Sequence, residues 1–139
     1  MSSAPEEHFV IETEFWVRFA ETDAAGIVHH AAYLVWMEEG RQNYGRTIGV
    51  DYATADVGLH VTGLEVRYHA PARFGDRIIV RCWIEEAKSR TVTFGYEIKE
   101  ARRGDLFVTG QVHLICINRS GQVARLPDEW KSKVPAQVS

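Results

Sequence analysis

The stretch ETDAAGIVHH, residues 21–30, contains the side chains with the clearest capacity for chemistry, because it places the carboxylate of Asp23 shortly before a predicted helix start. No Ser, Thr, Asp or Asn occupies His29, His30 or Ala31, from which a side chain would cap that helix. The first N–H groups are therefore predicted to be free to bind an oxygen that develops negative charge. Gly26 allows a tight turn that returns Asp23 towards these donors. A carboxylate beside such an oxyanion hole is typical of acyl-transfer chemistry.

A structural role for Asp23 stands beside this chemical one. An Asp in a strand-to-helix loop is more often a turn former than a catalyst, because its side chain bonds nearby backbone N–H groups. The side chain of His30 has two open roles: it could position water or the acyl group near neutral pH, or it could merely pack at the helix start. We expect its neighbour His29 to be exposed.

The elements that must position these residues follow from the spacing of apolar side chains. Alternating apolar positions from Phe9 to Phe19 predict a strand with one face on the core. Apolar residues at three- and four-residue steps predict a helix from about Ala31 to Thr47. This helix has bulky residues on nearly every side, including Leu34 and Val35, so we expect it to be well enclosed.

Four further strands are predicted downstream of the helix, each bounded by turn residues. They are Leu59–Tyr68, Arg77–Glu85, Arg90–Lys99 and Leu106–Asn118. Short connections favour antiparallel neighbours, and a lone long helix must bury its apolar face on the sheet. The pattern predicts an α+β fold, with a curved antiparallel five-stranded sheet wrapped around one central helix.

Size and charge bound the protein class. The 139 residues fit a single domain spanning 1–139, and the net charge of −3 argues against general affinity for nucleic acid or anionic membranes. No apolar run is long enough for stable membrane insertion and no leader pattern appears, so a cytoplasmic protein is predicted. Cys82 and Cys116 lie in strand-like segments, where a buried free thiol is expected rather than a disulfide.

The run VRFAETDAAGIVHHAAYLVWMEEGRQNYG resembles the signature of the 4-hydroxybenzoyl-CoA thioesterase family of hotdog-fold enzymes. The matching positions are Asp23, Ala25, Gly26, Ile27, Val28, Tyr33, Glu38 and Arg41. The segments YHAPARFGD and ARLPDEW are also similar to family segments, so the resemblance covers nearly the whole chain.

The resemblance implies roles for individual residues. Asp23 would be the catalytic carboxylate, acting as nucleophile or as general base, and the backbone N–H of His30 would polarise the thioester carbonyl. The substrate site would be shaped by Gly26, Ile27, Val28 and Tyr33. The segment AKSRTV is similar to a basic stretch that binds the CoA phosphates, which nominates Lys88, Ser89 and Arg90. Family members form homodimers and often homotetramers with sites between subunits, and we expect the same here.

Other reaction types are disfavoured by the remaining residues. No metal site and no cofactor are expected, because no HxxxH or HExxH spacing occurs among the histidines, which include His60, His69 and His113. For Glu38 a structural ion pair with Arg41 is favoured over an acid/base role, given their three-residue spacing.

The predicted function is hydrolysis of an acyl-CoA thioester to the free acid and CoA. The acyl group would be small and aromatic, or of short to medium chain length. Two alternatives remain: a hotdog-fold hydratase or dehydratase, and a non-catalytic acyl-CoA-binding protein.

Overall fold

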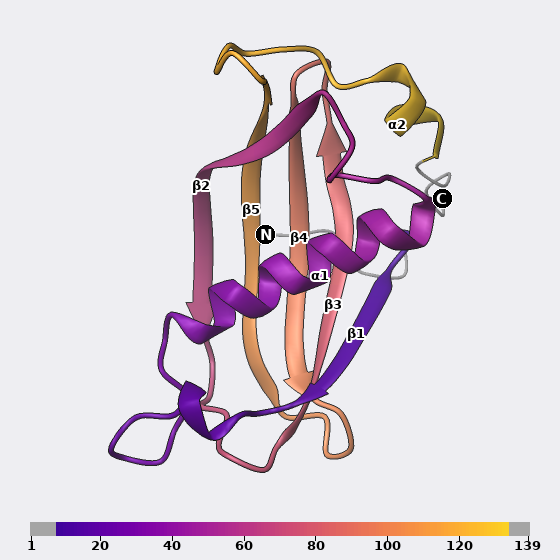
Figure 1. Cartoon of the computed structure of the whole chain (residues 1–139). Coiled ribbons are helices and arrows are strands. Elements are labelled where there is room, and N and C mark those ends of the chain that lie inside the picture. The colour runs from indigo at the N-terminus through magenta and orange to yellow at the C-terminus, as the bar shows by residue number, and fades with distance from the viewer. Residues whose placement is uncertain (1–7, 134–139) are drawn as a thin grey trace.

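Five strands and one long helix form the body of the protein in the computed structural model, which describes residues 8–133 (Figure 1). The strands are β1 (Ile11–Trp16), β2 (Val57–Tyr68), β3 (Arg77–Ala87), β4 (Thr91–Glu100) and β5 (Leu106–Asn118), and the helices are α1 (Ala32–Ile48) and α2 (Asp128–Lys133). The sheet order is β1-β3-β4-β5-β2, and all four neighbouring pairs are antiparallel. The predicted antiparallel sheet with one long helix across it is confirmed.

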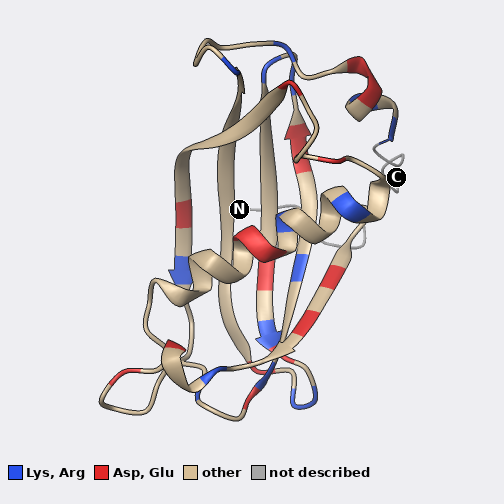
Figure 2. Cartoon of the chain, in the orientation of Figure 1, with Lys and Arg blue, Asp and Glu red and all other residues tan. Residues whose placement is uncertain are grey.

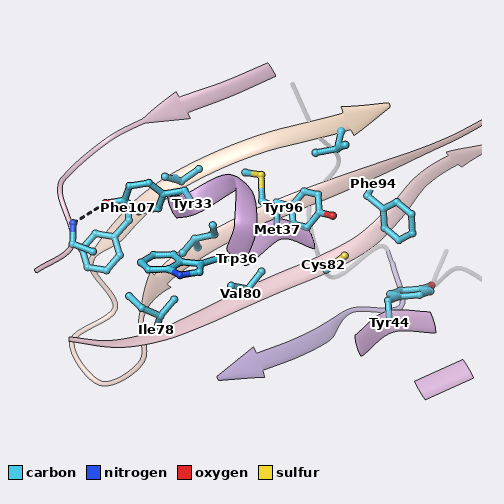
Figure 3. Close-up of a cluster of buried hydrophobic side chains, with 14 of the residues drawn as sticks. Tyr33, Trp36, Met37, Tyr44, Ile78, Val80, Cys82, Phe94, Tyr96 and Phe107 are labelled. Atoms are coloured by element: carbon cyan, nitrogen blue, oxygen red, sulfur yellow. Dashed lines mark hydrogen bonds between the residues drawn. The ribbon is translucent and has the colours of Figure 1, made fainter. Parts of the chain in front are cut away.

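The core lies between α1 and the concave face of the sheet (Figure 3). Trp36, Met37 and Tyr44 from α1 are buried against strand residues, among which Val80 and Tyr96 are fully enclosed. Gly40 lets the helix approach closely, since a Cβ there would lie 3.0 Å from Cγ1 of Val80. The apolar face of α1 is therefore held at a fixed distance from the sheet.

The ends of α1 agree with the prediction to within one residue. Ala31 is the N-cap and makes no side-chain cap hydrogen bond. Gly49 ends the helix at φ 85°, a left-handed conformation that glycine adopts without steric cost. The expectation that α1 is enclosed on nearly every side is wrong for this chain, because Val35 is 61 % exposed.

The first strand is shorter than predicted. β1 ends at Trp16, and Phe19 begins a 3₁₀ helix, Phe19–Glu21, instead of continuing the inward face of the strand. Phe19 is consequently 76 % exposed, and its ring makes an edge contact with the exposed ring of Phe74 at 5.7 Å. The chain turns at this point because the carboxylate of Glu21 accepts a hydrogen bond from the N–H of Arg18 at 2.8 Å.

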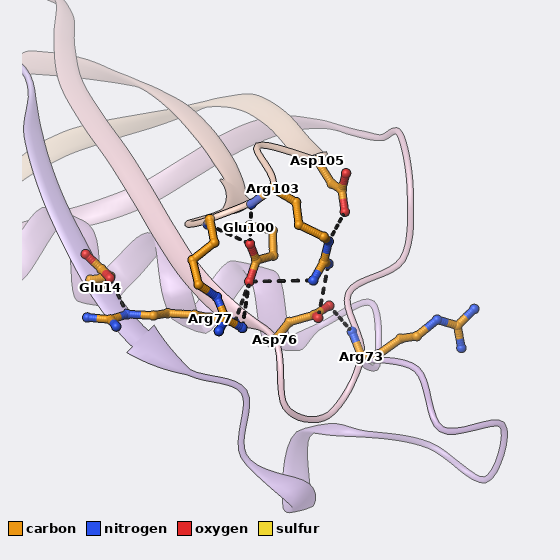
Figure 4. Close-up of polar contacts among 8 residues, drawn as sticks. Glu14, Arg73, Asp76, Arg77, Glu100, Arg103 and Asp105 are labelled. Atoms are coloured by element: carbon orange, nitrogen blue, oxygen red, sulfur yellow. Dashed lines mark hydrogen bonds and ion pairs between the residues drawn. The ribbon is translucent and has the colours of Figure 1, made fainter.

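A buried carboxylate fixes the turn between β4 and β5 (Figure 4). Glu100 accepts hydrogen bonds from the backbone N–H groups of Arg102, Arg103 and Arg77 at 2.6, 2.7 and 3.1 Å. These hydrogen bonds, led by that of Arg103, outweigh the cost of burial and lower the pKa of Glu100 to about 2. The Glu100 carboxylate therefore links this turn to the start of β3.

Acidic and basic side chains are mixed at both ends of the sheet (Figure 2). Among the helices of residues 8–133, none is long and apolar enough to cross a membrane.

Candidate active site

The Asp23 loop, residues 22–31, connects the 3₁₀ helix to α1 and is closed by hydrogen bonds within its own backbone. The N–H of Asp23 donates to the carbonyl of Ile27 at 2.8 Å, and Gly26 at φ 81° donates to the carbonyl of Asp23 at 3.0 Å. The positive φ explains why glycine occupies this position. Gly26 thus has the turn-forming role expected of it.

The Asp23 carboxylate has one occupied and one open oxygen. Oδ1 accepts hydrogen bonds from the N–H groups of Ala25 at 2.8 Å and Ile27 at 3.4 Å, which is the turn-forming role. Oδ2 accepts no hydrogen bond from the described residues, and the side chain is exposed. The structural role is therefore present, and it leaves one oxygen open for chemistry.

One bridge anchors the loop to the rest of the fold, and a second closes the loop on itself. Ile27 pairs with Arg73, and Thr22 pairs with Val28. The buried Val28 also donates its N–H to the carbonyl of Ala72 at 2.9 Å. Ile27 and Val28 thus hold the loop against the connection between β2 and β3.

Tyr33 contacts the same connection between β2 and β3. Its hydroxyl accepts a hydrogen bond from the N–H of Ala72 at 2.9 Å, and the side chain is buried beside Trp36 (Figure 3). Burial raises the pKa of Tyr33. In this chain Tyr33 contacts the backbone of Ala72, which also binds Val28.

The N–H of His30 is open at the start of α1. The N–H of His29 donates to the carbonyl of Glu21 at 2.8 Å, and that of Ala31 donates to Nδ1 of His29 at 3.2 Å. The N–H of His30 has no acceptor within the described part of the chain. The prediction of free N–H groups therefore applies to His30, whereas His29, expected to be simply exposed, also caps Ala31.

A hollow of about 480 Å³ lies between Asp23 and the start of α1, and we call it the Asp23 hollow. It is lined by Ala20, Glu21, Thr22, Asp23, His29, Ala32 and Val35. Its volume falls within the usual range for small-molecule sites. Asp23 and the first turn of α1 thus line one cavity, and His30 lies next to its lining residue His29. The ring centroids of His29 and His30 are 4.4 Å apart, and the two rings are tilted by 32°.

An apolar groove lies on the other side of Val35, between α1 and the edge strand β2. It encloses about 250 Å³, and Leu34, Val61 and Leu64 contribute to its walls. Glu38 and Arg41 also line it, but the predicted ion pair between them is wrong for this chain. Arg41 instead donates to the hydroxyl of Tyr96 at 3.1 Å.

The predicted phosphate-binding residues Lys88, Ser89 and Arg90 lie in the turn between β3 and β4. This turn and the Asp23 loop are at opposite ends of the sheet (Figure 1). The eleven residues of β3 separate the two ends by roughly 33 Å at ~3.3 Å per residue. One chain therefore does not bring Lys88 and Arg90 to its own Asp23.

Glu21 is the main site feature that the sequence-based reasoning missed. It lines the Asp23 hollow, and its carboxylate accepts a hydrogen bond from Nε1 of Trp36 at 2.8 Å. These two residues are fifteen positions apart, and no local pattern indicates that they meet. The contact between the exposed rings of Phe19 and Phe74 also joins residues far apart in the sequence, so no local pattern indicated it.

The sequence of residues 17–134 matches the model of the thioesterase-like superfamily. The chain belongs to this superfamily, so both the predicted hotdog fold and the assignment to the thioesterases are confirmed.

Particular relatives include the putative acyl-CoA thioesterase YneP of Bacillus subtilis, which is 34 % identical over 113 residues, or 79 % of this chain and 81 % of YneP. A 1,4-dihydroxy-2-naphthoyl-CoA thioesterase structure from Synechocystis has a TM-score of 0.82 at 26 % identity, covering 90 % of this chain and 95 % of its own. The DHNA-CoA thioesterase structure from Staphylococcus aureus gives 0.84 at 30 % identity, covering 89 % and 87 %.

The predicted resemblance to 4-hydroxybenzoyl-CoA thioesterase itself requires a correction. A structure of that enzyme has a TM-score of 0.83 but only 15 % identity, covering 91 % of this chain and 99 % of its own. It shares the fold, while the 1,4-dihydroxy-2-naphthoyl-CoA thioesterases are nearer in sequence.

Proposed function

We propose that this protein hydrolyses the thioester of an acyl-CoA to the free acid and CoA, using Asp23 and the backbone N–H of His30. The observation that supports this most directly is the pair of open groups at one loop: Oδ2 of Asp23 and the N–H of His30 each have no hydrogen-bond partner among residues 8–133.

In the proposed reaction the thioester carbonyl lies in the Asp23 hollow, with its oxygen at the N–H of His30. That donor and the positive end of α1 stabilise the negative charge that develops on the oxygen. Asp23 either takes a proton from an attacking water or attacks the carbonyl carbon itself to form a mixed anhydride, which water then cleaves. In both cases the carbon–sulfur bond breaks, and the thiolate of CoA leaves and is protonated.

We propose a small aromatic or a short- to medium-chain acyl group. The apolar groove beside α1 supports an apolar acyl group, and the aromatic thioesters named for the Synechocystis and Staphylococcus aureus proteins make aromatic acyl groups the first to test. In this proposal Gly26, Ile27 and Val28 hold the loop that places Asp23 at the reacting carbon. A screen of CoA esters from acetyl to palmitoyl, with benzoyl and phenylacetyl, measures the preference by thiol release.

The working form is proposed to be a homodimer, or a homotetramer built from two dimers. Lys88, Ser89 and Arg90 are too far from Asp23 in one chain to contact the same substrate, so in this proposal they bind the CoA phosphates at the site of the partner subunit. The exposed edge strand β2 and the apolar groove beside it support such an assembly.

The decisive variant is Asp23→Asn, which keeps the turn-forming oxygen and removes the basic one. We expect kcat to fall by ~10²–10⁴, as for loss of a general base, while folding is retained. Asp51→Asn is the matched control, because Oδ1 of Asp51 accepts the N–H of Ala53 at 3.0 Å in a similar exposed turn away from the site. Turnover at the wild-type rate in Asp23→Asn would overturn the catalytic proposal.

Further measurements separate the mechanisms and the alternative functions. Repeated single turnovers in ¹⁸O water leave label in the Asp23 carboxylate if Asp23 is the nucleophile, and none if it is a general base. A hydratase or dehydratase would change the absorbance of an enoyl thioester without releasing thiol. A binding protein would bind the ester and leave it intact.

A further inference from the structure

We propose that Glu21 is a positioning residue that fixes Asp23 relative to the start of α1. This inference rests on the proposed function, because it concerns the geometry of the same two groups. Glu21 is two residues before Asp23, and its carbonyl oxygen accepts the N–H of His29, the residue before His30. A shift of Glu21 therefore displaces both ends of the site.

The carboxylate of Glu21 is held by donors from two elements. Oε1 accepts the N–H of Arg18 at 2.8 Å, and Oε2 accepts both the guanidinium of Arg18 at 3.1 Å and Nε1 of Trp36 at 2.8 Å. The side chain is 15 % exposed. Trp36 is 1 % exposed in the core, so the contact from α1 is made by a side chain that cannot easily move.

These contacts distinguish Glu21 from Asp23. Both oxygens of the Glu21 carboxylate are occupied by donors, whereas Oδ2 of Asp23 is open. A carboxylate whose oxygens already bind two N–H groups and a guanidinium is poorly placed to accept a proton from water. Its effect on catalysis would therefore act through geometry, in which a displacement of about 1 Å can cost 10²-fold in rate.

The contact between Glu21 and Trp36 can be tested with a matched pair of variants. Trp36→Phe removes the Nε1–H donor to Glu21 and keeps an aromatic ring in the core. Trp83→Phe makes the same change on β3, where Nε1 of a tryptophan that is also 1 % exposed donates to the carboxylate of Glu85 at 2.5 Å. Both variants lose volume in the core and are expected to lower the melting temperature.

Of the two tryptophan variants, only Trp36→Phe is expected to lower kcat. The decrease should be about 10-fold per folded enzyme, with KM for the CoA ester within about twofold of wild type. Glu21→Gln should lower kcat in the same way, because one amide cannot accept all three hydrogen bonds. In Trp36→Phe, which leaves the charge of Glu21 in place, the pH profile of kcat should keep its wild-type shape. A changed pH profile in Trp36→Phe would overturn a purely positioning role.

Asp23→Asn, measured in parallel, separates the two proposals. If Asp23→Asn is inactive while Trp36→Phe and Glu21→Gln turn over like Trp83→Phe, the positioning role is wrong and the proposed function stands. If Asp23→Asn is fully active, the proposed function itself fails. Loss of kcat in Asp23→Asn, Trp36→Phe and Glu21→Gln, with Trp83→Phe unaffected, is the result expected.

Discussion

The hydroxyl of Tyr68 donates a hydrogen bond of 2.9 Å to the carbonyl oxygen of His30, the residue whose own N–H is left open. Tyr68 is the last residue of β2, and its ring also contacts the ring of Tyr33. An edge strand of the sheet therefore restrains His30, two residues before the start of α1. The orientation of the proposed oxyanion donor depends on a side chain that is distant in sequence.

Tyr68→Phe should lower kcat clearly and the free energy of unfolding only slightly. The variant keeps the aromatic contact and loses one hydrogen bond, which contributes about 0.5–1.5 kcal/mol to the free energy of unfolding. We expect kcat to fall several-fold, because His30 is held less firmly, with KM nearly unchanged. Thr47→Val is the control, since it removes a hydroxyl-to-carbonyl bond of 2.7 Å at the other end of α1. The same kcat in both variants would contradict the restraint.

Acid destabilisation should depend on Glu100. Its pKa is lowered from 4.5 to about 2 in the folded protein, so the unfolded chain binds more protons between these values. The stability that Glu100 contributes is therefore fully present above about pH 4.5 and is lost as the pH falls towards 2. Urea unfolding from pH 7 to 2 should show wild type and Glu100→Gln converging in that window. Two curves that stay parallel would reject this assignment.

The apolar groove predicts the oligomeric state. Light scattering at micromolar concentration should give the mass of a dimer or tetramer. Leu64→Lys, on the exposed edge strand β2, should shift the protein towards monomer and abolish activity. Val123→Lys is the matched control, because Val123 is 51 % exposed but lies outside the groove. A monomeric wild type would refute the proposed assembly.

Reversing the charges of Lys88 and Arg90 should affect only substrates that contain the nucleotide. We expect KM for CoA esters to rise on the order of 10-fold or more, since a hydrogen bond to a charged group contributes about 1.5–3 kcal/mol. Short pantetheine thioesters should be nearly unaffected, because they lack the phosphates. Arg119→Glu combined with Lys131→Glu controls for net charge. Equal losses on both classes of substrate would exclude phosphate binding by this turn.

The sequence predicted those parts of the fold that depend on local pattern. α1 was located to within a residue by its apolar spacing, and β5 by its apolar run between the turn sequences ARRGD and RSG. β1 was overextended because Phe19 fits the alternation, whereas the turn there depends on the hydrogen bond between Glu21 and Arg18.

Asp23 and free N–H groups at the helix start were inferred from residue type and the missing cap, and the family resemblance singled out the N–H of His30. Contacts between distant segments had no local signal: Glu21 with Trp36, Tyr68 with His30, and Arg41 with Tyr96 rather than Glu38.

The roughly 33 Å between the Lys88–Arg90 turn and Asp23, set by the length of β3, has a genetic consequence. In a dimer with shared sites, a chain bearing Asp23→Asn and a chain with Lys88 and Arg90 reversed are defective at different ends. Co-expression of the two would produce mixed dimers in which one site combines the intact Asp23 of one chain with the intact basic turn of the other. Two alleles that each fail alone would then complement each other.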